Sequence, residues 1–205
     1  MPSPWWPVAI LVTVGAVFAI LNRRVTNAIG RSANRFASSD TAHDFIGRVY
    51  RVAGAILFAF LMLRALWPSA DVGSGRILWL AHPLVGWLGL ALIVIGSTVI
   101  VAAERQIGAS WRIGIGAERT QLITAGLFTW SRNPTFLGML TSLAGIFLAE
   151  PTVVTGAVLA AAWVAFSVQV RMEEEHLQVV HGHACIQYRA EVPRWIGRSG
   201  RETTQ

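Results

Sequence analysis

Charge is scarce in this chain, and lysine is missing altogether. Only 14% of its 205 residues are charged, whereas a soluble domain carries about 25% charged residues. Its hydrophobic share of 54%, gathered into long runs, is instead typical of a protein whose solvent is lipid. The 17 basic residues are all arginine and leave a net charge of +6. Where these arginines lie along the chain should therefore show why positive charge is in excess.

Cysteine is also scarce. Cys185 stands alone, which excludes an internal disulfide, and we interpret it as a small buried residue because no base is fixed beside it. His176, His181 and His183 lie nearby, but Gly182 is expected to break the helix between them. Because no paired-cysteine or HExxH motif accompanies these histidines, we expect no metal site.

Five apolar segments predict an all-α integral membrane bundle of about five transmembrane helices. Crossing about 30 Å of hydrocarbon takes about 20 helical residues, and the second, third and fifth segments reach that length. The fourth is short and gains support as half of a helical hairpin, whose second helix is expected to begin at Pro151. The first contains no basic residue before Arg23, so we expect an uncleaved span rather than a signal peptide. The segments are 5–21, 45–67, 77–103, 135–149 and 151–170.

The arginines divide unequally between the two sides of these predicted spans. Only Arg64 and Arg76 fall on one side, and the other fifteen fall on the opposite side. Positive residues favour the cytosolic side, so we expect the N-terminus outside and the C-terminus in the cytosol, in what we interpret as a bacterial inner membrane. Topology and anionic lipid headgroups then explain the basic excess, and we expect no nucleic-acid partner.

Polar residues gather on the predicted cytosolic side. We therefore divide the chain into three N-terminal transmembrane helices (1–103) and a core of cytosolic loop, transmembrane hairpin and cytosolic tail (104–205), where the chemistry is expected. Trp111 and Trp130 lie inside that polar loop, where they either pack it down or line an adenine pocket.

A first candidate constellation opens the fourth span. Pro134 can occupy its first turn with Asn133 as N-cap, which leaves free N–H groups facing the cytosol. A helix N-terminus beside Arg132 suits a carboxylate or a phosphate. The alternative is an ordinary capped helix with Arg132 facing lipid headgroups.

A second constellation is the run of three glutamates after the fifth span, at 173–175. Successive helical residues point in different directions, so one or two of them can face a common pocket, one turn from Leu177. A buried carboxylate is costly unless it is paired, and a cationic ligand group or an arginine is expected beside it. The alternative is a solvated acidic turn with Arg171 as a local ion pair.

Taken in this order, the two constellations resemble the isoprenylcysteine carboxyl methyltransferase and phospholipid methyltransferase superfamily. The resemblance covers about residues 104–197 and includes the hairpin between two motif blocks. The first block reads Thr124, Gly126, Phe128, Arg132, Asn133, Pro134, Phe136 and Gly138. The second reads Glu173, Glu174, Leu177, Gly182, Tyr188, Val192, Pro193 and Arg194.

This resemblance implies transfer of a methyl group from S-adenosylmethionine to a lipophilic, membrane-embedded acceptor. Glu173 or Glu174 would bind the cofactor ammonium, and Arg132 with the helix N-terminus would bind its carboxylate. The implied cofactor-binding residues are Thr124, Gly126, Leu127, Phe128, Arg132, Asn133, Pro134, Phe136, Gly138, Glu173, Glu174 and Leu177. The candidate catalytic residues are Glu174, Arg171, His181 and Arg189.

The acceptor stays open because the chain departs from its relatives here. Carboxyl-methylating relatives are expected to use an arginine in the helix after the glutamates, where this chain has Val179, Val180 and His181. Arg171 and Arg189 are the nearest substitutes, so a lipid, a prenylated compound or another hydrophobic small molecule could be the acceptor. An amine or hydroxyl acceptor would need a base such as His181 or a glutamate.

Departures within the motif blocks are few. Asn133 stands where relatives often carry histidine, His181 stands in place of a phenylalanine, and Cys185 stands in place of a tyrosine. Two alternative functions remain: an intramembrane NADPH-dependent reductase resembling sterol reductases, and a non-catalytic membrane scaffold. The sequence does not determine the oligomeric state.

Overall fold

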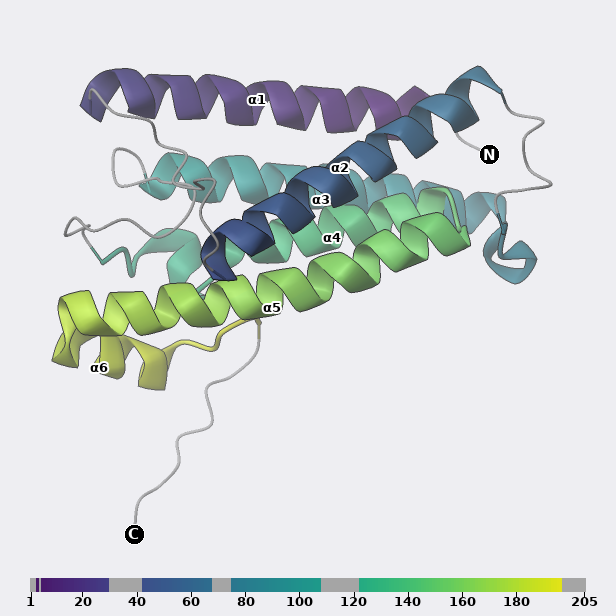
Figure 1. Ribbon diagram of the computed structural model, residues 1–205. Coiled ribbons are helices and arrows are strands. Elements are labelled where there is room, and N and C mark those ends of the chain that lie inside the picture. The colour runs from purple at the N-terminus through teal and green to yellow at the C-terminus, as the bar shows by residue number, and fades with distance from the viewer. Residues whose placement is uncertain (1–2, 4, 30–41, 68–74, 108–121, 197–205) are drawn as a thin grey trace, which may run out of the picture.

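The computed structural model of the chain is a bundle of long helices (Figure 1), which confirms the predicted all-α membrane fold. It describes all residues except 1–2, 4, 30–41, 68–74, 108–121 and 197–205, so Trp111 lies outside the described residues. The long helices are α1 (Trp5–Ile29), α2 (Ala42–Leu66), α3 (Pro83–Ile107), α4 (Pro134–Ala149) and α5 (Val153–His181). The shorter ones are η2 (Leu78–Leu80), η4 (Gly126–Thr129) and α6 (His183–Glu191).

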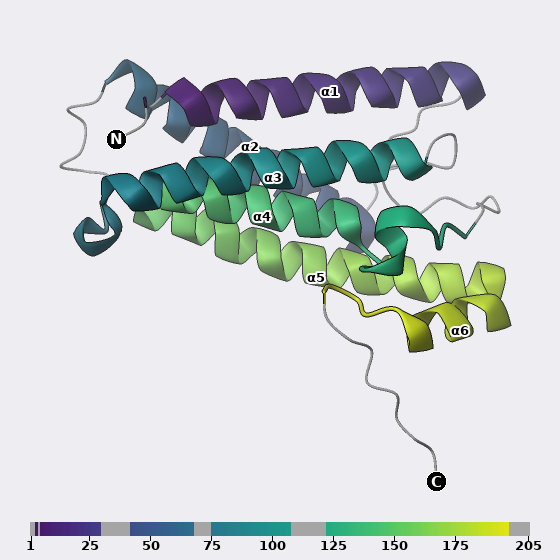
Figure 2. The same ribbon diagram turned by 180° about the vertical axis from the view of Figure 1, so that it is seen from behind.

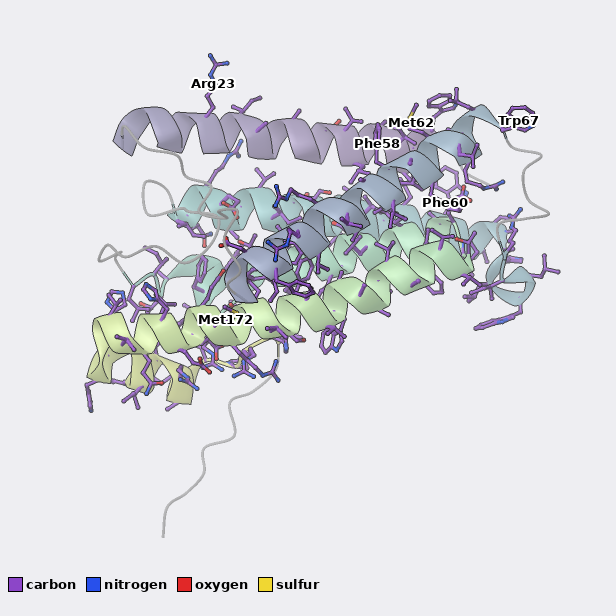
Figure 3. All side chains as sticks on the ribbon, in the orientation of Figure 1. Arg23, Phe58, Phe60, Met62, Trp67 and Met172 are labelled. Atoms are coloured by element: carbon purple, nitrogen blue, oxygen red, sulfur yellow. The ribbon has the colours of Figure 1, made fainter. Side chains whose placement is uncertain are left out.

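Among the described residues, three helices are long and apolar enough to cross a membrane, namely Asp44–Leu66, Pro83–Ile107 and Val153–His181, and α4 is a shorter apolar helix. Their outer faces carry exposed large hydrophobic side chains such as Val52, Ile95 and Trp163. Such a surface suits lipid rather than water. Figure 3 shows Trp67 at the end of α2 that lies away from α6, where an exposed indole fits a membrane interface.

Two predicted helix starts were wrong. The third span begins at Pro83 because residues 78–80 form a separate 3₁₀ turn. Pro151 does not occupy the first position of the fifth span, since Thr152 is the N-cap of α5. The Thr152 hydroxyl oxygen accepts a hydrogen bond from the Thr155 N–H at 3.2 Å. The Thr155 hydroxyl oxygen in turn accepts a hydrogen bond from the Thr152 N–H.

The fifth apolar segment ends at 170, and α5 continues beyond it to His181, as expected for glutamates that lie on a helix. The residues from Arg171 onward are good helix formers, and nothing interrupts the helix before Gly182, whose φ of +54° is readily adopted by glycine. Gly182 therefore breaks the helix as expected. With 29 residues, α5 is roughly 43 Å long and exceeds the hydrocarbon thickness of about 30 Å.

The closest helix pair is α3 and α4, which pack through glycines. A Cβ on Gly138 would lie 2.7 Å from the Gly96 carbonyl oxygen, and a Cβ on Gly145 would lie 2.7 Å from the Ile93 nitrogen. The two backbones touch with no side chain between them, as membrane helices rich in small residues do. This contact fixes the start of α4 beside the end of α3.

Replacing Gly145 with valine is expected to destabilise the bundle by at least about 1–3 kcal/mol, because the new side chain would push α3 and α4 apart. Thermal unfolding in detergent would measure the loss. Gly54→Val is the matched control, since a Cβ at that helical glycine meets no atom within 4 Å. Equal transition temperatures for the two variants would contradict the packing described above.

The polar parts of the chain meet at one end of the bundle. The C-terminal ends of α3 and α5, the N-terminal end of α4 and the whole of α6 lie together there (Figures 1 and 2). At the opposite end, Arg64 of α2 forms an ion pair with Glu150 at 3.4 Å. Arg23 of α1 points away from the other helices (Figure 3) and takes no part in either group.

Candidate functional site

The start of α4 is tied to the chain that follows α6. The Arg132 N–H donates to the Pro193 carbonyl oxygen at 3.0 Å. The Arg194 carbonyl oxygen accepts from the Ser131 hydroxyl at 3.3 Å and from the Asn133 side-chain amide at 3.1 Å. Two segments about sixty residues apart in sequence are thereby held in fixed contact.

Glu174 joins these two segments through its buried carboxylate. Arg194 donates from Nε to both carboxylate oxygens at 3.2 Å and from Nη2 to Oε2 at 2.9 Å. Asn133 Nδ2 donates to Oε1 at 3.4 Å, and Arg132 Nη2 lies 3.5 Å from Oε1. We call Arg132, Asn133, Glu174 and Arg194 the Glu174 cluster.

The Glu174 cluster carries an excess of positive charge. Burial lowers the pKa of Arg132, Glu174 opposes that shift, and the like charges of Arg189 and Arg194 add to it. The hydrogen bonds to Glu174 raise the pKa of Arg194, which is the more exposed of the two paired arginines. Arg132 Nε is buried and has no hydrogen-bond partner among the described residues. One carboxylate therefore faces two guanidinium groups, an arrangement that suits a ligand carboxylate or phosphate.

The turn before α4 is held by two further contacts. Gly126 opens η4 with a φ of +63°, and a Cβ there would lie 2.6 Å from Gln106 Oε1. That oxygen accepts a hydrogen bond from the Leu127 N–H at 2.9 Å. The Phe128 carbonyl oxygen accepts from the Tyr188 hydroxyl at 2.7 Å. Burial raises the pKa of Tyr188 to about 12, so its hydroxyl keeps the donated proton at neutral pH.

Replacing Tyr188 with phenylalanine is expected to destabilise the docking of α6 by about 1–3 kcal/mol, because the Phe128 carbonyl would lose its partner in a buried place. Thermal unfolding in detergent and protease cleavage between α5 and α6 would report the change. Unaltered stability and cleavage would contradict a structural role for this hydrogen bond.

Of the candidate residues around the N-terminal end of α4, Arg132 and Asn133 belong to the Glu174 cluster. Asn133 is the N-cap residue and Pro134 occupies the first turn, as predicted, although the Asn133 side chain makes no capping hydrogen bond. Its amide is used by Glu174 and Arg194 instead. Thr124 is exposed in the turn before η4. The Phe136 ring packs against Phe166 with centroids 5.3 Å apart.

The candidate catalytic residues are less closely grouped. Arg171 is exposed and donates to the Ser167 carbonyl oxygen at 2.6 Å. Arg189 donates a hydrogen bond to the side-chain oxygen of Gln178. His181 ends α5, and its Nε2 is buried without a hydrogen-bond partner among the described residues. Their roles stay predictions, as do those of half-buried Leu177 on α5 and of Gly138, which packs against α3.

The predicted site omitted several residues that build it. Arg194 and Tyr188 belong to the second motif block and could have been chosen on that ground. Ser131 and Gln106 form hydrogen bonds with the backbone of Arg194 and Leu127, and no spacing in the sequence predicts these partners. Among the described residues, no three histidine, cysteine or acidic side chains come together as a metal would require. Cys185 is buried, and burial raises the pKa of its thiol, which disfavours the nucleophilic thiolate.

Comparison with known proteins finds two related matches. The phospholipid methyltransferase family matches residues 84–184, from the start of α3 to the start of α6. A curated relative, protein-S-isoprenylcysteine O-methyltransferase of Mus musculus, is 28% identical over 129 residues, which cover 58% of this chain and 44% of that protein. The chain thus spans less than half the length of this relative. By these matches the chain resembles the superfamily of phospholipid and isoprenylcysteine carboxyl methyltransferases, and its long apolar helices support an integral membrane protein.

Proposed function

We propose that this protein transfers a methyl group from S-adenosylmethionine to a lipophilic acceptor dissolved in the membrane. The observation that carries the proposal is the Glu174 cluster, because it joins the two motif blocks at one end of the bundle. A water-soluble cofactor and a membrane-dissolved acceptor can both reach such a place. The asymmetry of the arginines supports a cytosolic position for this end.

The residues present fit the amino-acid end of the cofactor. Arg132 Nε is a buried donor without an acceptor among the described residues, and it would bind the cofactor carboxylate. Glu174 already interacts with two arginines, so we assign it to holding the pocket closed. Glu173 accepts a single side-chain hydrogen bond, from Gln169, and is the better candidate for the cofactor ammonium.

The chain's own contribution would be alignment and the exclusion of water. The sulfonium of a bound cofactor supplies an electrophilic methyl group, so the protein has mainly to orient donor and acceptor and keep water out. His181, with its unpartnered Nε2, is the candidate that could accept a proton from an amine or hydroxyl acceptor. Arg171 and Arg189 remain candidates for contacts with an anionic acceptor.

Incubation of the purified protein with methyl-labelled S-adenosylmethionine and a total lipid extract of its host would test this function. We expect labelled product in the organic phase, and no oxidation of NADPH when that cofactor is supplied instead. The Arg132→Ala variant should transfer much less label than a variant at exposed Glu175, Glu175→Ala. Oxidation of NADPH without any labelled lipid would favour a reductase and overturn the proposal.

A further inference from the structure

The chain after α6 turns back along α5 instead of leaving the bundle. Residues 192–196 are not helical, and we call them the strap. In Figures 1 and 2 the strap runs from the end of α6 beside α5, back toward the middle of that helix. The Trp195 ring stacks on the Trp163 ring of α5, with centroids 5.4 Å apart and an interplanar angle of 29°. Part of the segment predicted as a cytosolic tail therefore lies against a transmembrane helix.

The position of Trp163 gives the depth of this contact. Trp163 lies within the apolar segment 151–170. Because a helix rises about 1.5 Å per residue, Trp163 is roughly 10 Å inside the end of that segment. Trp195 also packs against a buried cluster of transmembrane residues, which consists of Leu140, Ala162 and Phe166. Both contacts place the Trp195 ring at the level of the hydrocarbon rather than in the water beyond it.

The backbone of the strap is suited to a place without water. Non-helical backbone is tolerated at membrane depth only where protein groups satisfy its polar atoms. Pro193 has no N–H to satisfy, and its carbonyl oxygen accepts a hydrogen bond from the Arg132 N–H. The Arg194 carbonyl oxygen accepts two hydrogen bonds, from the side chains of Ser131 and Asn133. Two consecutive carbonyl groups of the strap are thus satisfied without water.

The side chains of the strap differ in what they face. A charge at membrane depth is costly unless it is paired, and Arg194 is paired with Glu174 through contacts as short as 2.9 Å. Ile196, by contrast, is 71% exposed, and Trp163 beside the strap is 51% exposed. An exposed apolar surface at this depth suits lipid chains rather than water.

We propose that the strap is a re-entrant segment, held in the membrane by Trp195, whose Ile196 contacts the hydrocarbon chains of lipid on that side of the bilayer. The surface formed by Trp163, Trp195 and Ile196 then adjoins Arg194, and hence the Glu174 cluster. A lipid chain can lie against this surface while its headgroup reaches the cluster. Only this last step, which would place a methyl acceptor there, rests on the proposed function.

Spin-label accessibility in vesicles of phosphatidylcholine and phosphatidylglycerol would test the strap. Cys185 is the single cysteine of the chain, so a Cys185→Ala background allows one label at Ile196→Cys. The references are labels at Val164→Cys, an exposed apolar position on α5, and at Glu191→Cys, the exposed end of α6. Oxygen dissolves in hydrocarbon, whereas a nickel chelate stays in water. We expect oxygen to relax the labels at 196 and 164 more than the nickel chelate does, and the reverse at 191.

A charge placed on the strap gives a second measurement. A carboxylate in hydrocarbon is costly, so Trp195→Glu should move the label at 196 into water, where the nickel chelate relaxes it more than oxygen does. Trp130→Glu is the matched control, because Trp130 is 72% exposed in the turn before α4, and it should leave the label in lipid. The transition temperature of each variant in detergent verifies that the bundle stays folded.

Either of two results would overturn the inference. One is a label at 196 that the nickel chelate reaches as readily as it reaches the label at 191. The other is a folded Trp195→Glu variant in which the label at 196 behaves as it does beside the unmodified tryptophan. Neither measurement uses a cofactor or a methyl acceptor. A failure of methyl transfer would therefore count against the proposed function and not against the strap.

Discussion

Replacing Glu174 with alanine is expected to cost about 3–5 kcal/mol of stability and to abolish binding of S-adenosylhomocysteine, because two guanidinium groups would lose their buried partner. Arg132 would then face Arg194 and Arg189 with no carboxylate between them. Their repulsion should separate the start of α4 from the chain after α6. Thermal unfolding in detergent and calorimetric titration would measure the two losses.

Two companion variants make the Glu174 prediction specific. Glu174→Gln keeps the shape and one hydrogen-bond acceptor but removes the charge, so its stability should fall between those of the alanine variant and the unmodified protein. Glu175→Ala removes an exposed glutamate one position further along α5 and should change neither quantity. A Glu174→Ala protein as stable as the Glu175→Ala protein would contradict the role assigned to the cluster.

Replacing Arg132 with alanine is expected to affect binding far more than folding. Arg194 still holds Glu174 through three contacts in this variant, of which the shortest is 2.9 Å. The transition temperature should therefore fall only slightly. A charge-assisted hydrogen bond contributes about 1.5–3 kcal/mol, so S-adenosylhomocysteine should bind roughly ten- to hundredfold more weakly.

The Arg132 prediction also distinguishes which end of the ligand is bound. Binding of 5′-methylthioadenosine, which has no carboxylate, should be the same in the Arg132→Ala variant and in the unmodified protein. Arg171→Ala is the matched control, because Arg171 is exposed and contacts the Ser167 carbonyl oxygen. Equal losses for the two probes would show that Arg132 acts on the whole pocket rather than on a carboxylate.

Much of this fold could be predicted because membrane helices are encoded locally. Long apolar runs and the rarity of charge predict the bundle, and Pro134 and Gly182 mark a helix start and a helix break. The sequence also placed Arg132 and the glutamates at one end of the bundle. The apolar runs do not determine where a helix ends once it leaves the membrane, and the end of α5 at His181 follows from Gly182 instead.

The partners of individual side chains could not be predicted in the same way. Neighbouring glutamates on a helix point in different directions, but spacing alone does not tell which one meets the arginines. The structure pairs Glu174 with Arg132 and Arg194, whereas Glu173 accepts a hydrogen bond from Gln169.

The central claim is that the loop before α4 and the segment around α6 close into one cofactor pocket. Hydrogen–deuterium exchange of residues 122–137 and 171–196, with and without saturating S-adenosylhomocysteine, tests it most directly. We predict that the ligand slows exchange in both segments together and at the same ligand concentration. Protection of one segment alone, or of neither in a protein that remains folded, would contradict the claim.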